Sequence, residues 1–176
     1  LAAINPAIGG GLLLGPRGTG KTPAVRSLTD LLPDVERSLC PYGCLPEDIE
    51  SDGIEAVCDD CAQRYGQGEK LTYTDQVRLI DLPLTATLDD LIGAINEQAE
   101  MSGRRYSIRR GILANSDRNA LYIDEVNLLS DELVDAILDA AAQGIYTVRR
   151  GLLRATYRSR FTLIGSMNPE EGRLRP

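Results

Sequence analysis

The sequence predicts an α/β domain in which helices flank a parallel sheet. Apolar runs that favour strands occur at 11–14, 120–123 and 161–165, and helices are expected at about 21–32 and after Ser130. Strands and helices therefore alternate along the chain, and in such folds the ligand binds at the carboxyl ends of the strands. The length of 176 residues is sufficient for one domain with a buried core.

The first expected strand, predicted to be buried at 11–14, leads into a glycine-rich segment. This segment matches the pattern G-x-x-x-x-G-K-[ST] at every position, with Gly15, Pro16, Arg17, Gly18, Thr19, Gly20, Lys21 and Thr22. Glycines let backbone N–H groups approach an anion, Lys21 can reach the β- and γ-phosphates of a nucleotide, and Thr22 can hold Mg²⁺. We therefore predict that the whole segment binds nucleotide phosphates; the alternative is a glycine-rich turn without a ligand.

The helix that follows is expected to begin near Lys21 and to end before Pro33. The side chains expected on its core face are Val25, Leu28 and Leu32. Pro23 lies in its first turn, where proline is tolerated. The next strand of the sheet is expected at 77–80.

Two further helices are expected to start at residues that favour helix caps. Thr87 and Asp90 form a capping-box pattern, and Ser130 precedes a helix that Gly144 closes. The side chains expected to face inward are Leu88, Leu91, Ile92 and Ile95 in the first helix, and Leu133, Val134, Ile137, Leu138 and Ala141 in the second. Their spacing of three and four residues is typical of an amphipathic helix.

Two carboxylates, Asp124 and Glu125, end the apolar strand expected at 120–123. We predict that Asp124 holds Mg²⁺, directly or through water, and that Glu125 polarises the water that attacks the γ-phosphate. The alternative is a strand followed by a solvated acidic turn. The position about a hundred residues after a phosphate-binding segment favours the nucleotide site.

A polar amide follows the third strand, at Asn168. Beside the strand that carries the acids, this amide could orient the attacking water against the γ-phosphate. The alternative is an ordinary turn residue ahead of Pro169. The placement after a strand favours the catalytic role, so the predicted catalytic residues are Lys21, Glu125 and Asn168.

Two arginine-rich stretches, 104–111 and 146–157, are predicted to form β-hairpin arms with Arg-Gly turns. They could be solvated surface hairpins. Because arginine is concentrated there in an otherwise acidic chain, we favour contact surfaces. Our hypothesis is that Arg149 and Arg150 contact a partner or a neighbouring subunit.

The four cysteines, Cys40, Cys44, Cys58 and Cys61, lie in the long connection 33–75. Two close thiol pairs about a dozen residues apart match a structural Zn²⁺ site with four thiolate ligands. Two disulfides, an iron–sulfur cluster and four free thiols are the alternatives. The sequence favours Zn²⁺.

The composition excludes several classes of protein. The net charge of −7 argues against a nucleic-acid binder, and no apolar run approaches the roughly 20 residues of a membrane span. No signal peptide is visible, and because the sequence starts at Leu1 without an initiator Met, we expect a further segment upstream. There is no histidine, so any metal site must use thiolates, carboxylates or hydroxyls.

Taken together, these segments resemble one family, the I subunit of magnesium chelatase, which is an AAA+ ATPase. The matching segments are, in collinear order, 8–10, 15–22, 81–87, 111–114, 121–129, 139–144 and 168–176. The strings DLPL at 81–84 and NPEEGRLRP at 168–176 are more specific than the phosphate-binding pattern.

The resemblance implies a P-loop AAA+ core over 1–176, with β-hairpin inserts and a cysteine-bearing insertion at 33–75. It implies an ATP- and Mg²⁺-using motor that forms a hexamer-like ring in the cytoplasm or the plastid stroma. With other chelatase subunits, such a motor drives Mg²⁺ insertion into protoporphyrin IX, and an arginine from a neighbouring protomer completes its site. The family's arginine finger, helical lid and second sensor are expected beyond Pro176.

Two other functions fit the same residues. One is a cobaltochelatase subunit or a MoxR-like chaperone ATPase of the same clade, with the same motor chemistry. The other is a non-catalytic scaffold that binds nucleotide only as a structural ligand. The presence of Lys21, Thr22, Asp124 and Glu125 together argues against the scaffold.

Overall fold

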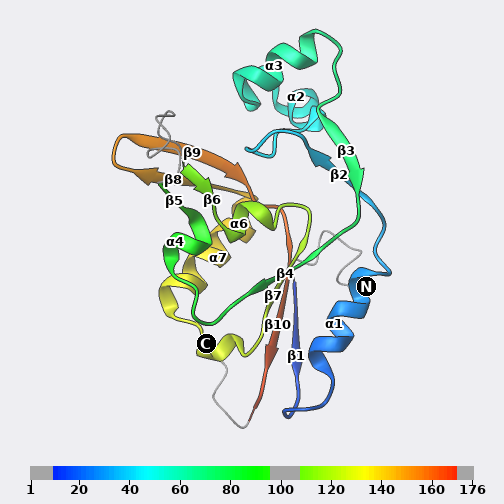
Figure 1. Cartoon of the computed structure of the whole chain (residues 1–176), viewed down its shortest axis with the longest axis vertical. Helices are drawn as coiled ribbons and strands as arrows, with labels where there is room; N and C mark the ends of the chain where they lie inside the picture. Colours follow the sequence, from blue (N-terminus) through cyan, green and yellow to red (C-terminus); the bar gives the residue numbers. More distant parts are fainter. Residues whose placement is uncertain (1–9, 96–107, 170–176) are drawn as a thin grey trace.

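The centre of the molecule is a four-stranded parallel sheet (Figure 1), in a computed structural model that describes residues 10–95 and 108–169. The strand order is β1–β10–β7–β4, with β1 at Gly10–Leu14, β10 at Thr162–Met167, β7 at Ala120–Ile123 and β4 at Leu79–Leu82. The parallel sheet and its flanking helices confirm the predicted α/β class. The strand expected at 77–80 begins two residues later, because β4 pairs with β7 only from Leu79 onward.

The helices around the sheet are short, apart from one. They are α1 (Lys21–Thr29), α4 (Leu88–Ile92), α6 (Ile112–Asn115), the 3₁₀ turn η2 (Val126–Leu128) and α7 (Asp131–Gln143). Helix α1 runs through Pro23 as expected, but it ends at Thr29 rather than near Leu32. The N–H groups of Leu31 and Leu32 bond the carbonyls of Leu28 and Thr29, three residues back, which tightens the chain into a turn.

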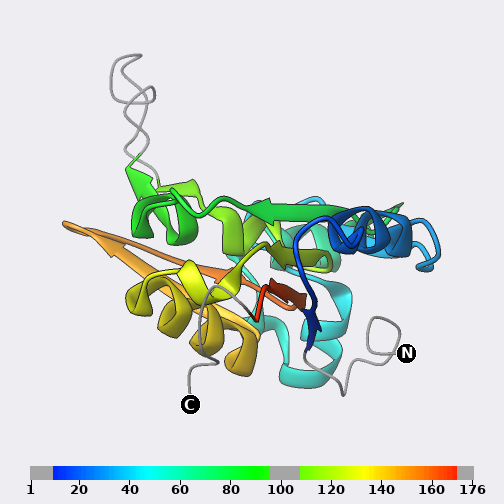
Figure 2. The ribbon, with the colours of Figure 1, turned by 90° about the horizontal axis from the view of Figure 1, so that it is seen from below.

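Strand β7 carries the core on both of its faces because its successive side chains alternate. Leu121 and Ile123 pack in the larger apolar cluster, against α4, α6 and α7. Ala120 and Tyr122 face the opposite way, against Val25 of α1. Figure 2 shows α1 and α7 on opposite sides of the sheet, so the fold has three layers.

Strand β1 is not buried as the sequence predicts. Leu12, Leu13 and Leu14 are 44%, 38% and 57% exposed. Within the described residues β1 pairs only with β10 and lies at the edge of the sheet. An apolar run predicts a strand but does not show whether that strand is central or at an edge.

The capping predictions hold in position, but parts of both core faces are wrong. Thr87 caps α4 by accepting a hydrogen bond from the Asp90 N–H at 3.2 Å. Helix α4 ends at Gly93, so Ile95 lies in strand β5 (Gly93–Ile95) and is exposed. The bond from Gly93 N to the Asp89 carbonyl closes the helix.

Helix α7 starts after Ser130 and ends at Gly144, which adopts a left-handed conformation (φ 67°). The side chain of Ser130 makes no capping hydrogen bond. The buried residues of α7 are Leu133, Ile137 and Ala140, whereas Leu138 is 54% exposed and Ala141 is also exposed. The helix therefore rests on the sheet along a narrower stripe than the one expected.

Only one of the two predicted hairpins has the expected form. Strands β8 (Ile145–Arg150) and β9 (Leu153–Arg158) pair antiparallel around Gly151. In the stretch 104–111, residues 104–107 lie outside the described residues, and β6 (Ile108–Arg110) pairs with β5. Gly111 precedes α6 (Ile112–Asn115) as its N-cap instead of making a hairpin turn. The position requires glycine, because a Cβ there would lie 2.3 Å from the Leu91 carbonyl oxygen.

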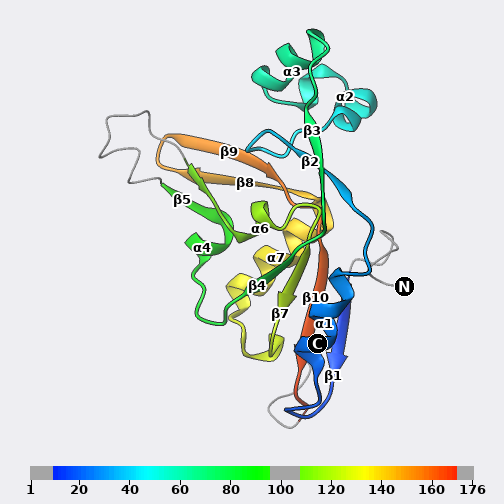
Figure 3. The same cartoon turned by 45° about the vertical axis from the view of Figure 1, so that its right-hand side comes forward.

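The stretch 33–75 has its own secondary structure. Strands β2 (Val35–Ser38) and β3 (Thr72–Asp75) form an antiparallel ribbon, which carries α2 (Pro46–Asp52), η1 (Ile54–Ala56) and α3 (Asp59–Gly66). We call residues 39–71 the cysteine module. Figure 3 shows this module and the β8–β9 hairpin extending from the same end of the sheet in different directions. The domain boundaries 1–176 and 33–75 stay a prediction.

The ribbon is anchored to the core by Asn119, which is buried. Its Oδ1 accepts hydrogen bonds from the Arg37 guanidinium at 2.6 Å and from the Arg78 N–H at 2.8 Å. Its Nδ2 donates to the Asn115 carbonyl at 2.9 Å. One side chain thus joins β2, the start of β4 and the end of α6.

Two leucines test which faces form the core. Leu121→Ala removes a fully buried side chain from β7 and should cost about 2–5 kcal/mol in free energy of unfolding. Leu138→Ala removes the same atoms from an exposed position of α7 and should cost under about 1 kcal/mol. Urea unfolding followed by circular dichroism measures both, and equal losses would contradict the assignment.

Candidate functional site

The predicted nucleotide-binding residues meet at the carboxyl edge of the sheet. Leu14 of β1 is in register with Met167 of β10, and Gly165 of β10 is in register with Ile123 of β7. The Gly15 N–H donates to the Met167 carbonyl at 3.2 Å, which attaches the glycine-rich segment to β10. This edge lies at the bottom of Figure 1, where β1 and β10 end.

A cavity of ≈ 320 Å³ opens at this edge. Its lining consists of Arg17, Gly18, Thr19, Gly20, Lys21, Thr22, Pro23, Asp124, Glu125 and Asn168. The structure thus brings together residues that the sequence places in three separate segments. Asn168 is only 4% exposed, so its amide lies in the wall of the cavity rather than in a solvated turn.

The segment 15–22 folds back on itself around Lys21. The Lys21 ammonium donates to the carbonyls of Gly15 at 2.6 Å and Pro16 at 2.8 Å. Gly18 and Gly20 have φ angles of 77° and 78°, which side chains with a Cβ rarely adopt. The loop therefore requires glycine at these positions, and α1 begins directly after it.

Hydroxyl groups connect Thr22 to Asp124. Thr22 Oγ1 lies 3.1 Å from the Tyr122 hydroxyl, which donates to Asp124 Oδ1 at 3.2 Å. Ser166 Oγ also donates to Asp124 Oδ1. Hydroxyl and carboxylate oxygens are the hard ligands that Mg²⁺ prefers, so the chemistry of this donor set fits a magnesium ion.

Tyr122 and Ser166 are site residues that the sequence prediction missed. Tyr122 lies in β7, two positions before Asp124, and Ser166 lies in β10, two positions before Asn168. Side chains two apart on a strand point to the same face. This two-residue spacing is the signal in the sequence from which both residues could have been predicted.

Glu125 has an unusual backbone. Its φ of 54° is left-handed, which costs roughly 1–2 kcal/mol for a residue with a Cβ. Its N–H donates to Ser166 Oγ at 3.3 Å. Its carboxylate lies 3.1 Å from the Arg17 guanidinium, and because Arg17 is largely exposed, this ion pair adds little stability.

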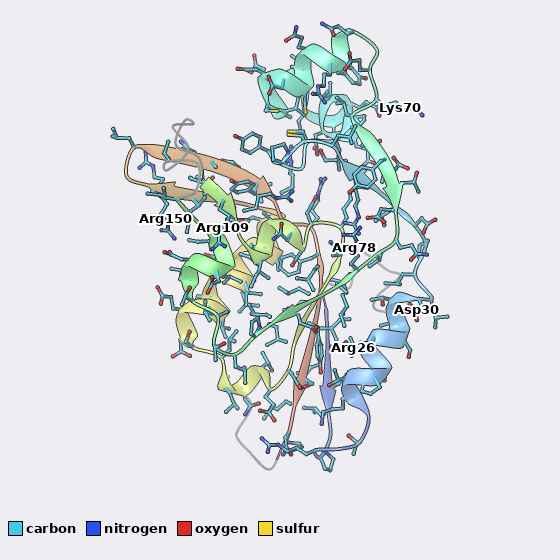
Figure 4. The ribbon with its side chains drawn as sticks, viewed as in Figure 1. Arg26, Asp30, Lys70, Arg78, Arg109 and Arg150 are labelled. Atoms are coloured by element: carbon cyan, nitrogen blue, oxygen red, sulfur yellow. The ribbon has the colours of Figure 1, made fainter. Side chains whose placement is uncertain are left out.

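The four cysteines gather in the cysteine module, at the opposite end of the molecule. Their sulfurs lie within 4.8 Å of one another, and no disulfide joins any two of these four residues. The hydrogen bond with Cys44 lowers the pKa of Cys40 to about 5, and burial raises the pKa of Cys61 to about 12. Figure 4 shows these sulfur atoms beside α2 and α3, far from the sheet's carboxyl edge.

Among the described residues, no helix has the length and apolar character that crossing a bilayer requires.

Comparison with known proteins finds an AAA domain and similarity to magnesium-chelatase subunits. A family model for an AAA domain matches residues 8–165. The chain is 44% identical to a magnesium-chelatase subunit ChlI homolog of Methanocaldococcus jannaschii and 44% identical to a chloroplastic magnesium-chelatase subunit ChlI of Glycine max. It is 42% identical to a magnesium-chelatase 38 kDa subunit of Acidiphilium rubrum.

Each of these matches covers the whole chain, but only 47%, 41% and 50% of the relatives. The chain therefore spans about half the length of the curated relatives it matches. A solved structure of the complex between subunits BchI and BchD of magnesium chelatase aligns with a TM-score of 0.71 and 38% identity. That alignment covers 100% of this chain and 52% of the other.

The two lysines of the chain provide a matched test of the cavity. Lys21→Ala should weaken binding of Mg²⁺·ADP roughly ten- to a hundredfold, because it removes a charged hydrogen-bond donor. Lys70→Ala changes an exposed lysine of the cysteine module and should leave the affinity unchanged. Titration calorimetry measures both; an unaltered affinity for Lys21→Ala would contradict the phosphate role of Lys21.

Proposed function

The chain belongs to the I-subunit family of magnesium chelatases, within the AAA domains, and we propose that it acts as their ATP-hydrolysing motor. The observation that carries the proposal is the cavity at the sheet edge, which joins the glycine-rich segment to Asp124, Glu125 and Asn168. This arrangement holds the parts that phosphoryl transfer to water needs. A scaffold that only binds nucleotide would need neither the Glu125 carboxylate nor the polar amide of Asn168.

In this proposal the triphosphate of ATP lies along the N–H groups at the start of α1. The Lys21 ammonium exchanges the carbonyls of Gly15 and Pro16 for phosphate oxygens. Thr22 and Asp124 hold Mg²⁺, directly or through water, and the ion would neutralise negative charge on the phosphates. The Tyr122 and Ser166 hydroxyls keep the Asp124 carboxylate oriented toward Thr22.

Hydrolysis then requires one oriented water molecule. The Asn168 amide positions the water against the γ-phosphorus, and the Glu125 carboxylate accepts its proton. The new P–O bond forms as the bond to the β-phosphate oxygen breaks, so that ADP and phosphate leave. Arg17 pairs with Glu125 in this structure and must release the carboxylate for this step.

We further propose that the chain works in a hexamer-like ring with other chelatase subunits. The BchI–BchD complex supports this assembly by similarity. An arginine from a neighbouring protomer would complete the site and stabilise the transferred phosphoryl group. The work of the complex would be Mg²⁺ insertion into protoporphyrin IX, in the cytoplasm or the plastid stroma.

For such contacts we propose Arg149 and Arg154 rather than Arg149 and Arg150. The Arg150 side chain pairs with Asp89 of α4, and Arg109 of β6 pairs with Asp90 (Figure 4). Arg149 is exposed and lies directly opposite Arg154 on β9, which is also exposed. Like charges that face each other across a hairpin destabilise it, so an acidic partner surface would relieve the repulsion.

The Glu125→Gln protein tests the hydrolytic role. Because glutamine cannot accept the proton, ATP turnover should fall at least about a hundredfold, with nucleotide affinity unchanged within about threefold. Glu132→Gln, at an exposed position of α7, is the control. Turnover is measured by phosphate release at protein concentrations that give the oligomer. Normal turnover by the Glu125→Gln protein would show that Glu125 is not the general base.

Charge reversal at Arg149 and Arg154 together tests the contact surface. Nucleotide-dependent assembly, followed by sedimentation velocity with and without partner chelatase subunits, should shift toward smaller species, while Mg²⁺·ADP binding persists. The control reverses Arg64 and Lys70, which are exposed on the cysteine module. An unchanged distribution of species would show that the hairpin makes no such contact.

Mixtures of the unaltered chain with partner chelatase subunits, assayed for Mg²⁺ or Co²⁺ insertion, distinguish a magnesium chelatase from a cobaltochelatase or a MoxR-like ATPase.

A further inference from the structure

We infer that the four cysteines form a closed structural Zn²⁺ site that holds the cysteine module together and against β9. Cys40 Sγ lies 3.7 Å from Cys44 Sγ and 3.6 Å from Cys58 Sγ. All four sulfurs, including that of Cys61, lie within 4.8 Å of one another. Four thiolates at about 2.3 Å from one zinc ion are about 3.8 Å apart in a tetrahedron. The thiols are therefore already at the separations that a single ion requires.

The arrangement does not favour a pairing into disulfides. Bonded sulfurs lie about 2.0 Å apart, and Cys40 is almost equally distant from Cys44 and from Cys58. No pair is therefore singled out for a disulfide, and all four sulfurs lie within 4.8 Å of one another. A cluster of several iron atoms would hold its thiolates farther apart, whereas tetrahedral sulfur ligands around one ion suit zinc.

Backbone N–H groups and nearby arginine side chains can stabilise thiolates at this position. The Tyr42 N–H donates to Cys40 Sγ at 3.3 Å, and the Cys58 N–H donates to Cys44 Sγ at 3.4 Å. Hydrogen bonds of this kind orient metal ligands. Arg154 and Arg158 of β9 line a crevice of ≈ 380 Å³ together with Cys44 and Cys58. The positive charge of Arg154 would offset part of the net negative charge of four thiolates around a divalent ion, whereas Arg158 pairs with Asp48.

Apart from these thiols the cysteine module has only a small core, in which the side chain of Leu45 is also buried. Its apolar cluster contains three buried residues, Cys44, Cys61 and Leu71, with Ile49 and Val57 packed against them. So small an apolar cluster contributes little stability. Metal binding would therefore supply folding free energy to the module, as it does in small zinc domains.

The metal would also fix the surface that docks on β9. The Tyr42 carbonyl, inside the Cys40–Cys44 loop, accepts a hydrogen bond from the Arg158 N–H at 3.2 Å. Asp48 of α2 is buried and lies 3.3 Å from both the Arg158 and the Arg160 guanidinium groups. The module is thus held to the strand that leads directly into β10.

Elemental analysis of the full chain tests the site. The protein is purified with a tag that needs no metal resin, under reducing conditions and without chelator. We expect one Zn²⁺ per chain, retained by Lys70→Ala and lost from Cys58→Ser. Exchange for Co²⁺ should give the visible absorption of a tetrahedral tetrathiolate site.

A second measurement on the unaltered chain covers the case in which Cys58→Ser does not fold. Titration with a mercurial reagent should release the Zn²⁺ to a colour indicator as four thiols react. Protein without zinc and with four freely reactive thiols would overturn the inference. So would bound iron, or two disulfides in place of the thiols. None of these results depends on nucleotide binding or hydrolysis.

Discussion

The parallel pairing of β10 with both β1 and β7 is the constraint on which the rest of the structure depends. It fixes the height at which each strand ends, so the glycine-rich segment, the acid pair and Asn168 arrive at one edge of the sheet. Gly10 allows the close approach of β1 to β10, because a Cβ there would lie 2.5 Å from the Leu163 carbonyl oxygen. The nucleotide-binding edge is therefore a property of the sheet rather than of any one loop.

The sequence predicted the parts of the site whose chemistry is local. The glycine-rich segment, Asp124 and Glu125 are recognisable because the residues that act are adjacent in the chain. Predictions failed where a neighbour in space decides the outcome: β1 is exposed because it lies at the sheet edge, and α7 rests on Ala140 rather than on Leu138. Tyr122 is a site residue because its hydroxyl lies between Thr22 and Asp124, which only the folded chain reveals.

The cysteine connection shows the same division. Four thiols at short spacings predicted a cluster, and the structure places their sulfurs together. The helices around them lacked a detectable periodicity, since they are short and bury few apolar side chains. The donor atoms at the two ends of the molecule differ in chemical hardness, with hydroxyl and carboxylate oxygens at the sheet edge and thiol sulfurs in the module. Oxygen donors suit Mg²⁺, whereas thiolates select softer ions such as Zn²⁺.

Asn119 ties the ribbon to the rest of the chain in a way that limits its motion. A single amide oxygen accepts from Arg37 on β2 and from the residue before β4, while the amide nitrogen is held by the end of α6. A tilt of the ribbon would have to break hydrogen bonds to the start of β4 or the end of α6. The position of the thiol-bearing tip is therefore coupled to the outer strand of the sheet.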